Sequence, residues 1–233
     1  MGNGINQKEL NEIKELVCDE VDARASMLIE ASHAIHENPE LNFEEHFAHE
    51  LLTGILEDED LSPTRKAYDL DTAFEANIEG TGPTVAVLCE YDALPDIGHA
   101  CGHNIIATAG LGAGLAAATV AKRMGGSLRI LGTPAEEGGG GKVFMGDRGA
   151  FDKVDAALMV HPASGDLVRM NTIAIHRLQV EYEGQAAHAA ASPHRGKNAL
   201  DAAVLGYQNI AALRQHIRPD ERIHGIFTDG GRK

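Results

Sequence analysis

The pattern of hydrophobic and polar positions predicts two amphipathic helices at the start of the chain. Apolar residues recur with a helical period over residues 8–36, and Asn38 followed by Pro39 ends this segment. A second helix is expected over residues 44–56, before an acidic run and a turn at residues 62–63. Neither predicted helix carries clustered reactive side chains, so neither is expected to take part in chemistry.

Three short apolar runs further along have the pattern of buried strands, and helical segments separate them. The runs cover residues 84–89, 127–131 and 156–160, and the helices cover residues 105–123 and 142–149. This alternation predicts an α/β fold with an open mixed sheet and flanking helices. Residues 73–78 and the glycine-rich turn after them are expected to form a hairpin with the first run.

The pattern changes after about Asn171 and predicts a second, smaller α+β domain. Residues 172–183 alternate like a half-exposed strand, residues 198–217 form a strong amphipathic helix, and residues 222–227 return to a strand pattern. We therefore expect a first domain over residues 1–171 and the start of a second over residues 172–233.

Composition and charge indicate which kinds of molecule the protein is not expected to bind. The net charge of −15 disfavours nucleic acids and anionic membranes, because both need a basic surface. No uninterrupted apolar stretch approaches the length of a membrane span, and the first residues lack the pattern of a secretory signal. Three widely spaced cysteines do not suggest a disulfide framework. The sequence therefore predicts a soluble, cytoplasmic protein that binds neither nucleic acid nor anionic membrane.

Polar side chains follow each of the three predicted buried strands. Cys101 and His103 come after the first strand, Glu136 and Glu137 after the second, and His161 directly after the third. In open α/β sheets, sites lie beyond the carboxyl ends of the strands, so these side chains are expected to converge if the strands are neighbours.

Thiolate, imidazole and carboxylate are the side-chain groups that bind zinc and similar divalent metals. Gly102 allows the backbone to turn so that both of its neighbours can face one ion. Adjacent Glu136 and Glu137 diverge, so one can bind metal while the other accepts a proton from a water that the metal activates. Asp92 is placed to orient a ligand imidazole. This combination predicts metal-assisted hydrolysis.

Each motif alone has an ordinary structural interpretation. In a single Cys-x-His, the cysteine is commonly buried in the core and the histidine commonly forms a structural hydrogen bond. A Glu-Glu pair commonly lies in a solvated turn. An alternative chemistry makes Cys101 a nucleophile with His103 as its base, but it leaves Glu137 and His161 without roles. The three closely spaced glycines at 110, 112 and 114 fall inside a predicted helix, which favours close helix packing over phosphate binding.

These residues resemble the aminoacylase and glutamate-carboxypeptidase family of two-domain metallopeptidases. Within it, the sequence is most similar to the amidohydrolase branch of aminobenzoyl-glutamate hydrolase, the indole-acetyl-amino-acid hydrolases and the β-alanyl-lysine dipeptidase-like proteins. The similarity runs from about residue 30 to the end of the chain. The matching stretches are residues 90–95, 98–104, 132–141, 155–162 and 184–200.

The resemblance implies a two-metal site, with zinc as the first expectation and manganese or cobalt as alternatives. Its implied ligands are Cys101, His103, Glu137 and His161, with the thiolate bridging the ions. It implies that Glu136 is the general base and acid. The substrate class that it implies is an N-acyl amino acid or a dipeptide-like molecule with a scissile amide bond.

The resemblance also implies roles for the second domain. Residues 172–233 look like the start of a lid and dimerisation domain, which implies a homodimer. His188 matches the histidine that polarises the scissile carbonyl. Asn198 matches a position that binds the substrate carboxylate, and it is equally suited to cap the helix that follows.

The sequence departs from the family pattern at its C-terminal end. We expect the rest of the lid and a returning segment with a final histidine ligand to be missing. The alternative function is therefore a metal-binding or dimerising fragment that does not catalyse.

Overall fold

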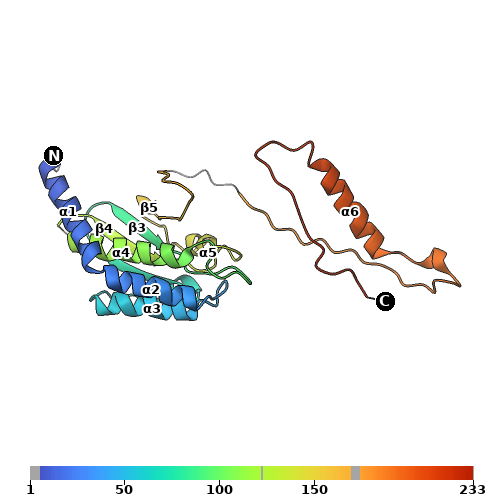
Figure 1. Ribbon diagram of the computed structural model, residues 1–233, viewed down its shortest axis with the longest axis horizontal. Coiled ribbons are helices and arrows are strands. Elements are labelled where there is room, and N and C mark those ends of the chain that lie inside the picture. Colours follow the sequence, from blue (N-terminus) through green and yellow to red (C-terminus); the bar gives the residue numbers. More distant parts are fainter. Residues whose placement is uncertain (1–5, 122, 169–173, 233) are drawn as a thin grey trace. The chain divides into compact units, whose positions relative to one another are not determined.

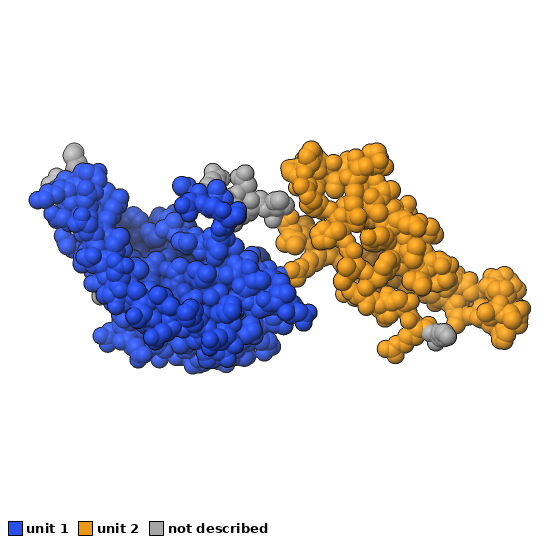
Figure 2. All heavy atoms as spheres, in the orientation of Figure 1, with its two compact units in different colours: residues 1–168 blue, residues 169–233 orange. Residues whose placement is uncertain are grey.

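The computed structural model describes residues 6–121, 123–168 and 174–232 (Figure 1). The chain divides into two compact units, residues 1–168 and 169–233, which Figure 2 colours separately. The predicted boundary between residues 171 and 172 lies outside the described residues. The elements of the first unit are α1 (Gln7–Ala23), α2 (Ala25–Glu37), α3 (His46–Asp58), β1 (Thr64–Arg65), η1 (Ala67–Asp69), β2 (Phe74–Ile78), β3 (Thr84–Cys89), α4 (His103–Ala121), β4 (Ser127–Gly132), α5 (Gly141–Asp147) and β5 (Ala156–Leu158).

The five strands form one mixed sheet in the order β1-β2-β4-β3-β5. β3 pairs in parallel with both β4 and β5, whereas β2 pairs antiparallel with β4. The predicted open mixed sheet with flanking helices is therefore confirmed. The predicted hairpin of β2 with β3 is wrong, because β4 lies between them. The connection after β2 passes over the turn before β4, where the Gly82 N–H donates to the Gly125 carbonyl at 2.6 Å.

The first predicted helix is two helices, α1 and α2, with a break at Arg24. The backbone of Arg24 leaves the helical conformation at φ −102° and ψ 3°. Its guanidinium binds Glu20 on α1 and Glu59 just after α3, at 2.6 and 2.8 Å. These contacts join the break to the end of both neighbouring helices, α1 and α3. The second predicted helix is confirmed as α3.

The main core lies between the sheet and helices α2, α3 and α4. Its largest buried side chains include Ile35 of α2, Leu52 and Leu56 of α3, Phe74 of β2 and Leu111 of α4. A smaller cluster with Met145 of α5 packs on the opposite face of the sheet. The helices α1 to α4 can be followed on one side of the sheet in Figure 1.

Helix α4 is long and apolar enough, by length and composition, to cross a membrane. The expectation that no such stretch exists was therefore wrong. In the structure 61% of its most apolar window is buried, and the helix packs on β3, β4, α1 and α2. Burial in the core accounts for its composition. Its glycines serve close packing, as predicted: an added Cβ at position 114 would meet the Ile130 side chain at 2.6 Å.

The last strand of the sheet is shorter and more exposed than its apolar sequence predicts. β5 ends at Leu158, and Leu158 and Val160 are 61% and 67% exposed. The prediction of a buried strand here is wrong, because β5 lies at the edge of the sheet beside β3. Within the described residues, no further strand pairs with its outer side.

The second unit contains η2 (Pro193–Arg195) and α6 (Ala199–Leu213). The predicted helix over residues 198–217 is confirmed as α6, although it ends at Leu213. Of the predicted strands, the described residues 174–183 and 222–227 form none, so that prediction is wrong. A strand needs a hydrogen-bonded partner, and the described part of this unit supplies only an isolated bridge between Gln185 and Lys197.

Gly110→Ala is expected to lower the free energy of unfolding by about 2 kcal/mol, because α4 packs directly on β3 at this point. An added Cβ would lie 2.4 Å from the Leu88 carbonyl oxygen and 2.9 Å from Cys89 Sγ. Gly54→Ala on α3 is the matched control, since no described heavy atom lies within 4 Å of its added Cβ. That variant is expected to gain up to about 1 kcal/mol from helix propensity. Urea unfolding measures both, and equal stabilities of the two variants would contradict this packing account.

Candidate metal centre

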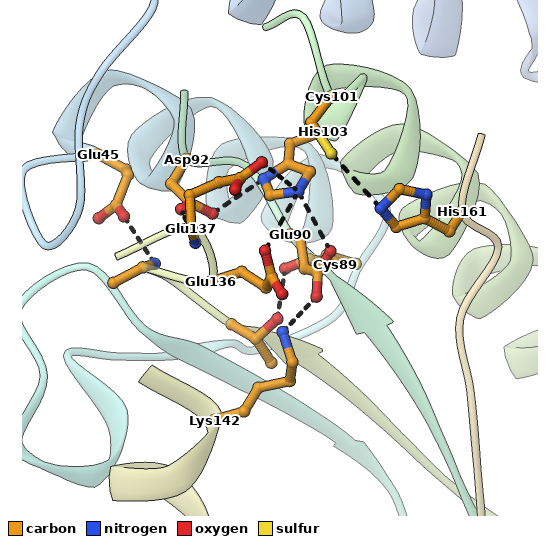
Figure 3. Close-up of polar contacts among 12 residues, drawn as sticks. Glu45, Cys89, Glu90, Asp92, Cys101, His103, Glu136, Glu137, Lys142 and His161 are labelled. Carbon is orange, nitrogen blue, oxygen red and sulfur yellow. Dashed lines mark hydrogen bonds and ion pairs between the residues drawn. The ribbon is translucent and has the colours of Figure 1, made fainter. Parts of the chain in front are cut away.

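Three parallel strands, β4, β3 and β5, end at the same edge of the sheet and carry the candidate residues there. The segment after β3 supplies Asp92 and leads to Cys101 and the start of α4 at His103. The segment after β4 supplies Glu136 and Glu137, and the segment after β5 supplies His161. These side chains point toward one another in Figure 3. The predicted convergence is therefore present in the structure.

The imidazole of His103 lies at the centre of this group and is completely buried. Its Nδ1 lies 3.0 Å from Asp92 Oδ1, so Nδ1 carries the proton and donates to the carboxylate. The other oxygen of Asp92 accepts from the backbone N–H of Glu137 at 2.8 Å. One carboxylate thus fixes both the imidazole and the loop after β4.

The second ring nitrogen of His103 faces carboxylates. His103 Nε2 lies 3.6 Å from Glu90 Oε2 and 3.8 Å from both Glu136 Oε2 and Glu137 Oε1. Among the described residues it has no hydrogen-bond partner. A buried nitrogen surrounded by carboxylates needs a proton or another cation between them.

The pKa directions follow from this arrangement. Burial alone would lower the pKa of His103, but the hydrogen bond with Asp92 and the charges of Asp92 and Glu90 raise it above its usual value. Burial opposes ionisation of Asp92, but its hydrogen bonds with His103 and the Glu137 N–H hold its pKa below the usual range. The two groups therefore stabilise each other as an ion pair in the absence of metal.

Cys101 and His161 complete the group from another side. Cys101 Sγ lies 3.6 Å from His161 Nε2. Gly102 has a left-handed φ of +85°, and a Cβ there would lie 2.9 Å from Pro162 Cγ. A glycine is therefore needed both for the turn between Cys101 and His103 and for its close packing on the loop after β5.

These donors suit divalent metal ions. The ligand atoms of Cys101, His103 and His161 lie within 4.8 Å of one another, and so do those of His103, Glu136 and Glu137. Thiol, imidazole and carboxylate are the donors that zinc prefers. Because the two groups share His103, and because its Nε2 is buried without a partner among the described residues, the residues fit one or two divalent cations.

The alternative in which Cys101 acts as a nucleophile finds little support. Burial and then the hydrogen bond with Glu137 raise the pKa of Cys101 to about 12, so a metal-free thiol stays protonated at neutral pH. The nitrogen of His103 that could take its proton faces three carboxylates. A bound cation would instead favour the thiolate as a ligand.

The sequence did not reveal three residues around the site. Glu90 is buried directly after β3 and forms an ion pair with Lys142 of α5. Glu45 is buried just before α3 and accepts from the Ala135 N–H. An acid directly after a buried strand was a usable signal for Glu90. Nothing local marks Lys142 or Glu45, because their partners are distant in the sequence.

The second unit contains two predicted site residues, Asn198 and His188, and each forms hydrogen bonds within that unit. Asn198 caps α6, since its Oδ1 accepts from the Leu200 N–H at 3.0 Å and the Asp201 N–H at 3.4 Å. His188 Nδ1 accepts from the backbone N–H of Ala191 at 3.1 Å, in an exposed turn. The capping interpretation of Asn198 is confirmed, and the substrate roles of both residues stay predictions.

Comparison with known proteins identifies the family. The sequence pattern of Peptidase family M20/M25/M40 matches residues 67–223, a stretch that includes all of the candidate ligands. The chain belongs to peptidase family M20. The resemblance drawn from the motifs is thereby confirmed.

Two curated relatives match this M20 chain along most of its length. It is 44% identical to the Xaa-Arg dipeptidase of Mus musculus over 97% of this chain and 56% of that protein. It is 35% identical to a p-aminobenzoyl-glutamate hydrolase polypeptide of Escherichia coli (strain K12) over 95% of this chain and 50% of the relative. The chain thus spans about half the length of the curated relatives it matches.

Two solved structures share the fold. A putative aminohydrolase from methicillin-resistant Staphylococcus aureus superimposes with a TM-score of 0.64 at 23% identity, over 90% of this chain and 59% of the other. The Bacillus subtilis YXEP protein, described as a dinuclear metal-binding peptidase from the M20 family, matches with a TM-score of 0.53 at 27% identity, over 58% and 42%. The fold of the M20 chain is therefore that of known members.

Asp92→Asn is expected to destabilise the metal-free M20 chain most between about pH 4 and about pH 6.5. Because the folded pKa of His103 is raised, its contribution is complete below the unfolded pKa and is lost as the pH rises through the folded value. Because the folded pKa of Asp92 is lowered, its contribution is present above the unfolded pKa and is lost as the pH falls through the folded value.

Urea unfolding of chelator-treated wild type and variant across this pH range measures the difference, which is expected to reach about 2 kcal/mol. Asp71→Asn is the control, because Asp71 is 72% exposed and pairs with a surface lysine. A difference for Asp92→Asn that does not change with pH would contradict the ion-pair account.

Proposed function

We propose that the protein hydrolyses an amide bond in an N-acyl amino acid or dipeptide-like substrate with the help of divalent metal. The observation that carries this proposal is the buried Nε2 of His103, which has no hydrogen-bond partner among the described residues. It lies among carboxylates, beside a thiol and a second imidazole, at the edge where three strands end. A cation there would neutralise groups that are otherwise costly to bury together.

The ligands that we propose are Cys101, His103, Glu137 and His161, holding two ions. The description of the Bacillus subtilis relative as dinuclear supports this number. Zinc is the first choice because it accepts thiolate, imidazole and carboxylate together, with manganese or cobalt as alternatives. When bound, such ions supply Lewis acidity and lower the pKa of water.

Glu136 is the proposed general base and acid. Its side chain is 42% exposed, against 21% for Glu137, so it is the more accessible of the two to substrate and water. Burial and then the negative charge of Glu90 raise the pKa of Glu136. A raised pKa suits a carboxylate that takes a proton from water and returns it to the leaving amine. The backbone of Glu137 is held by Asp92, which suits a fixed ligand.

The names of the relatives support the substrate class. One is named for dipeptides that end in arginine and the other for p-aminobenzoyl-glutamate. Both kinds of molecule contain an amide bond to an amino acid. We propose that this chain hydrolyses the same kind of amide bond in the cytoplasm.

The second unit is the proposed lid and dimerisation region. His188 would polarise the scissile carbonyl, and Asn198 would bind the substrate carboxylate beside its capping role. Support comes from exposed apolar side chains in this unit, such as Leu178 at 86% and Ile226 at 86% exposure. Such surface is typical of a region that is covered in an assembly.

The alternative is that these 233 residues bind metal or dimerise without catalysing. The observation that favours it is the span of the chain, about half of each curated relative. Metal binding is common to both proposals, whereas turnover separates them.

Purified chain supplemented with zinc, manganese or cobalt is expected to retain up to two ions and to hydrolyse members of a panel of N-acyl amino acids and dipeptides. Glu136→Gln should keep the metal and lower kcat by at least about 100-fold, because it removes the proton acceptor but no proposed ligand. Metal analysis and steady-state kinetics measure the two effects.

Glu44→Gln is the control for this variant, since its carboxylate is exposed and lies outside the site. Wild type that retains no metal would overturn the proposed function. Metal retention without turnover of any panel member would favour the alternative, and full activity of Glu136→Gln would remove Glu136 as the base.

A further inference from the structure

The loop between α2 and α3 contacts two of the segments that carry site residues. In this loop, residues 38–45, the Glu40 carbonyl accepts from the Ala93 N–H at 2.7 Å, next to Asp92. The Glu45 carboxylate accepts from the Ala135 N–H at 2.8 Å, next to Glu136. The loop therefore contacts the backbones of both of these segments.

Glu45 is a fully buried carboxylate with three hydrogen-bond donors around it. Its Oε1 accepts from the backbone N–H groups of Phe43 at 3.0 Å and Ala135 at 2.8 Å, and its Oε2 accepts from the Thr72 hydroxyl at 2.7 Å. Burial raises the pKa of Glu45, and these hydrogen bonds oppose the rise. Burying a carboxylate is energetically unfavourable, so its three hydrogen-bond donors are needed to hold Glu45 in this position.

Both backbone donors belong to residues in a strained conformation. Phe43 and Ala135 have left-handed φ values of +63° and +57°, although neither is a glycine. Each such position is destabilising for a residue other than glycine and persists only where the surroundings hold it. Glu45 holds the N–H of both.

The conformation of Ala135 determines the course of the loop after β4. Its carbonyl accepts from the N–H groups of Gly139 and Gly141, both at 3.2 Å. The intervening turn carries Glu136 and Glu137. The Phe43 ring also lies against this turn, since an added Cβ on Gly139 would meet it at 2.4 Å. Figure 3 draws Glu45 with its contact to this loop.

We propose that Glu45 is a positioning residue for the metal centre, acting through the Ala135 N–H to direct Glu136 and Glu137 toward His103. It touches neither metal nor substrate in this account. Its effect on catalysis rests on the proposed function, whereas its effect on the loop does not.

Glu45→Met removes the acceptor and keeps a side chain of similar length, so it tests the proposal directly. We expect the zinc affinity, measured by competition with a chelator, to fall about 10- to 100-fold, as is typical when groups behind a metal ligand are lost. Exchange of the Ala135 amide hydrogen, followed by NMR, should become faster. Glu45→Gln keeps one acceptor oxygen and should restore slow exchange and near wild-type zinc affinity.

Glu40→Met is the matched control, because it changes the side chain and leaves the backbone carbonyl that accepts from the Ala93 N–H. The Glu40 carboxylate also accepts two backbone N–H groups, of Phe47 at 2.8 Å and Ala48 at 3.1 Å, but these belong to the start of α3. This variant should lose stability while its zinc affinity and its Ala135 exchange stay at wild-type values. A merely structural role for Glu45 predicts the same result for Glu45→Met, and that result would overturn the proposal.

Thr72→Val provides a second test should Glu45→Met fail to fold, because it removes one donor to Glu45 at similar volume. Faster Ala135 exchange in this variant is expected, and unchanged exchange with unchanged zinc affinity would contradict the proposal. A wild-type chain that binds zinc without turnover would contradict only the proposed function. If it bound no zinc, Ala135 exchange would still decide the role of Glu45.

Discussion

The hydrogen bond between Asp92 and His103 is the interaction on which the rest of the site depends. It joins the segment after β3 to the first residue of α4, and the same carboxylate holds the Glu137 N–H of the loop after β4. With Nδ1 committed to Asp92, Nε2 must point toward the carboxylates. Without a cation this arrangement is electrostatically unfavourable, because Glu90 is also buried beside His103 Nε2. The ion pair between Glu90 and Lys142 compensates only one of the negative charges.

The fold makes this arrangement possible through two constraints of packing. The parallel order β4-β3-β5 brings the ends of three strands to one edge. Helix α4 then lies close against β3 and β4 because glycines replace larger side chains on its packed face, at positions 110 and 114. His103 is the first residue of this closely packed helix. The loop between α2 and α3 contacts the same edge of the sheet through Glu45, which accepts from the Ala135 N–H. The helical layer therefore contributes to the site as well as to the core.

The sequence predicted the parts of this site that local pattern controls. Cys101, His103 and His161 stood out because they follow apolar runs with the pattern of strands, and the carboxyl ends of neighbouring parallel strands lie at one edge of a sheet. Strand partners were harder, since an apolar run does not say which strand lies beside it, and β4 separates the expected hairpin. β5 is exposed because it lies at the edge of the sheet, which its own sequence does not show. The strands expected in the second unit need pairing partners that its described residues do not supply. Glu45 escaped notice because its partner Ala135 is 90 residues away.

We propose that the three strand ends form one metal centre with Cys101 among its ligands. Titration of the chain with cobalt(II), followed by absorption spectroscopy, tests this most directly, because a thiolate bound to cobalt gives a ligand-to-metal charge-transfer band. We expect such a band in the wild type and its loss in Cys101→Ser. A wild-type spectrum without the band, or identical spectra of the two proteins with cobalt bound, would contradict it.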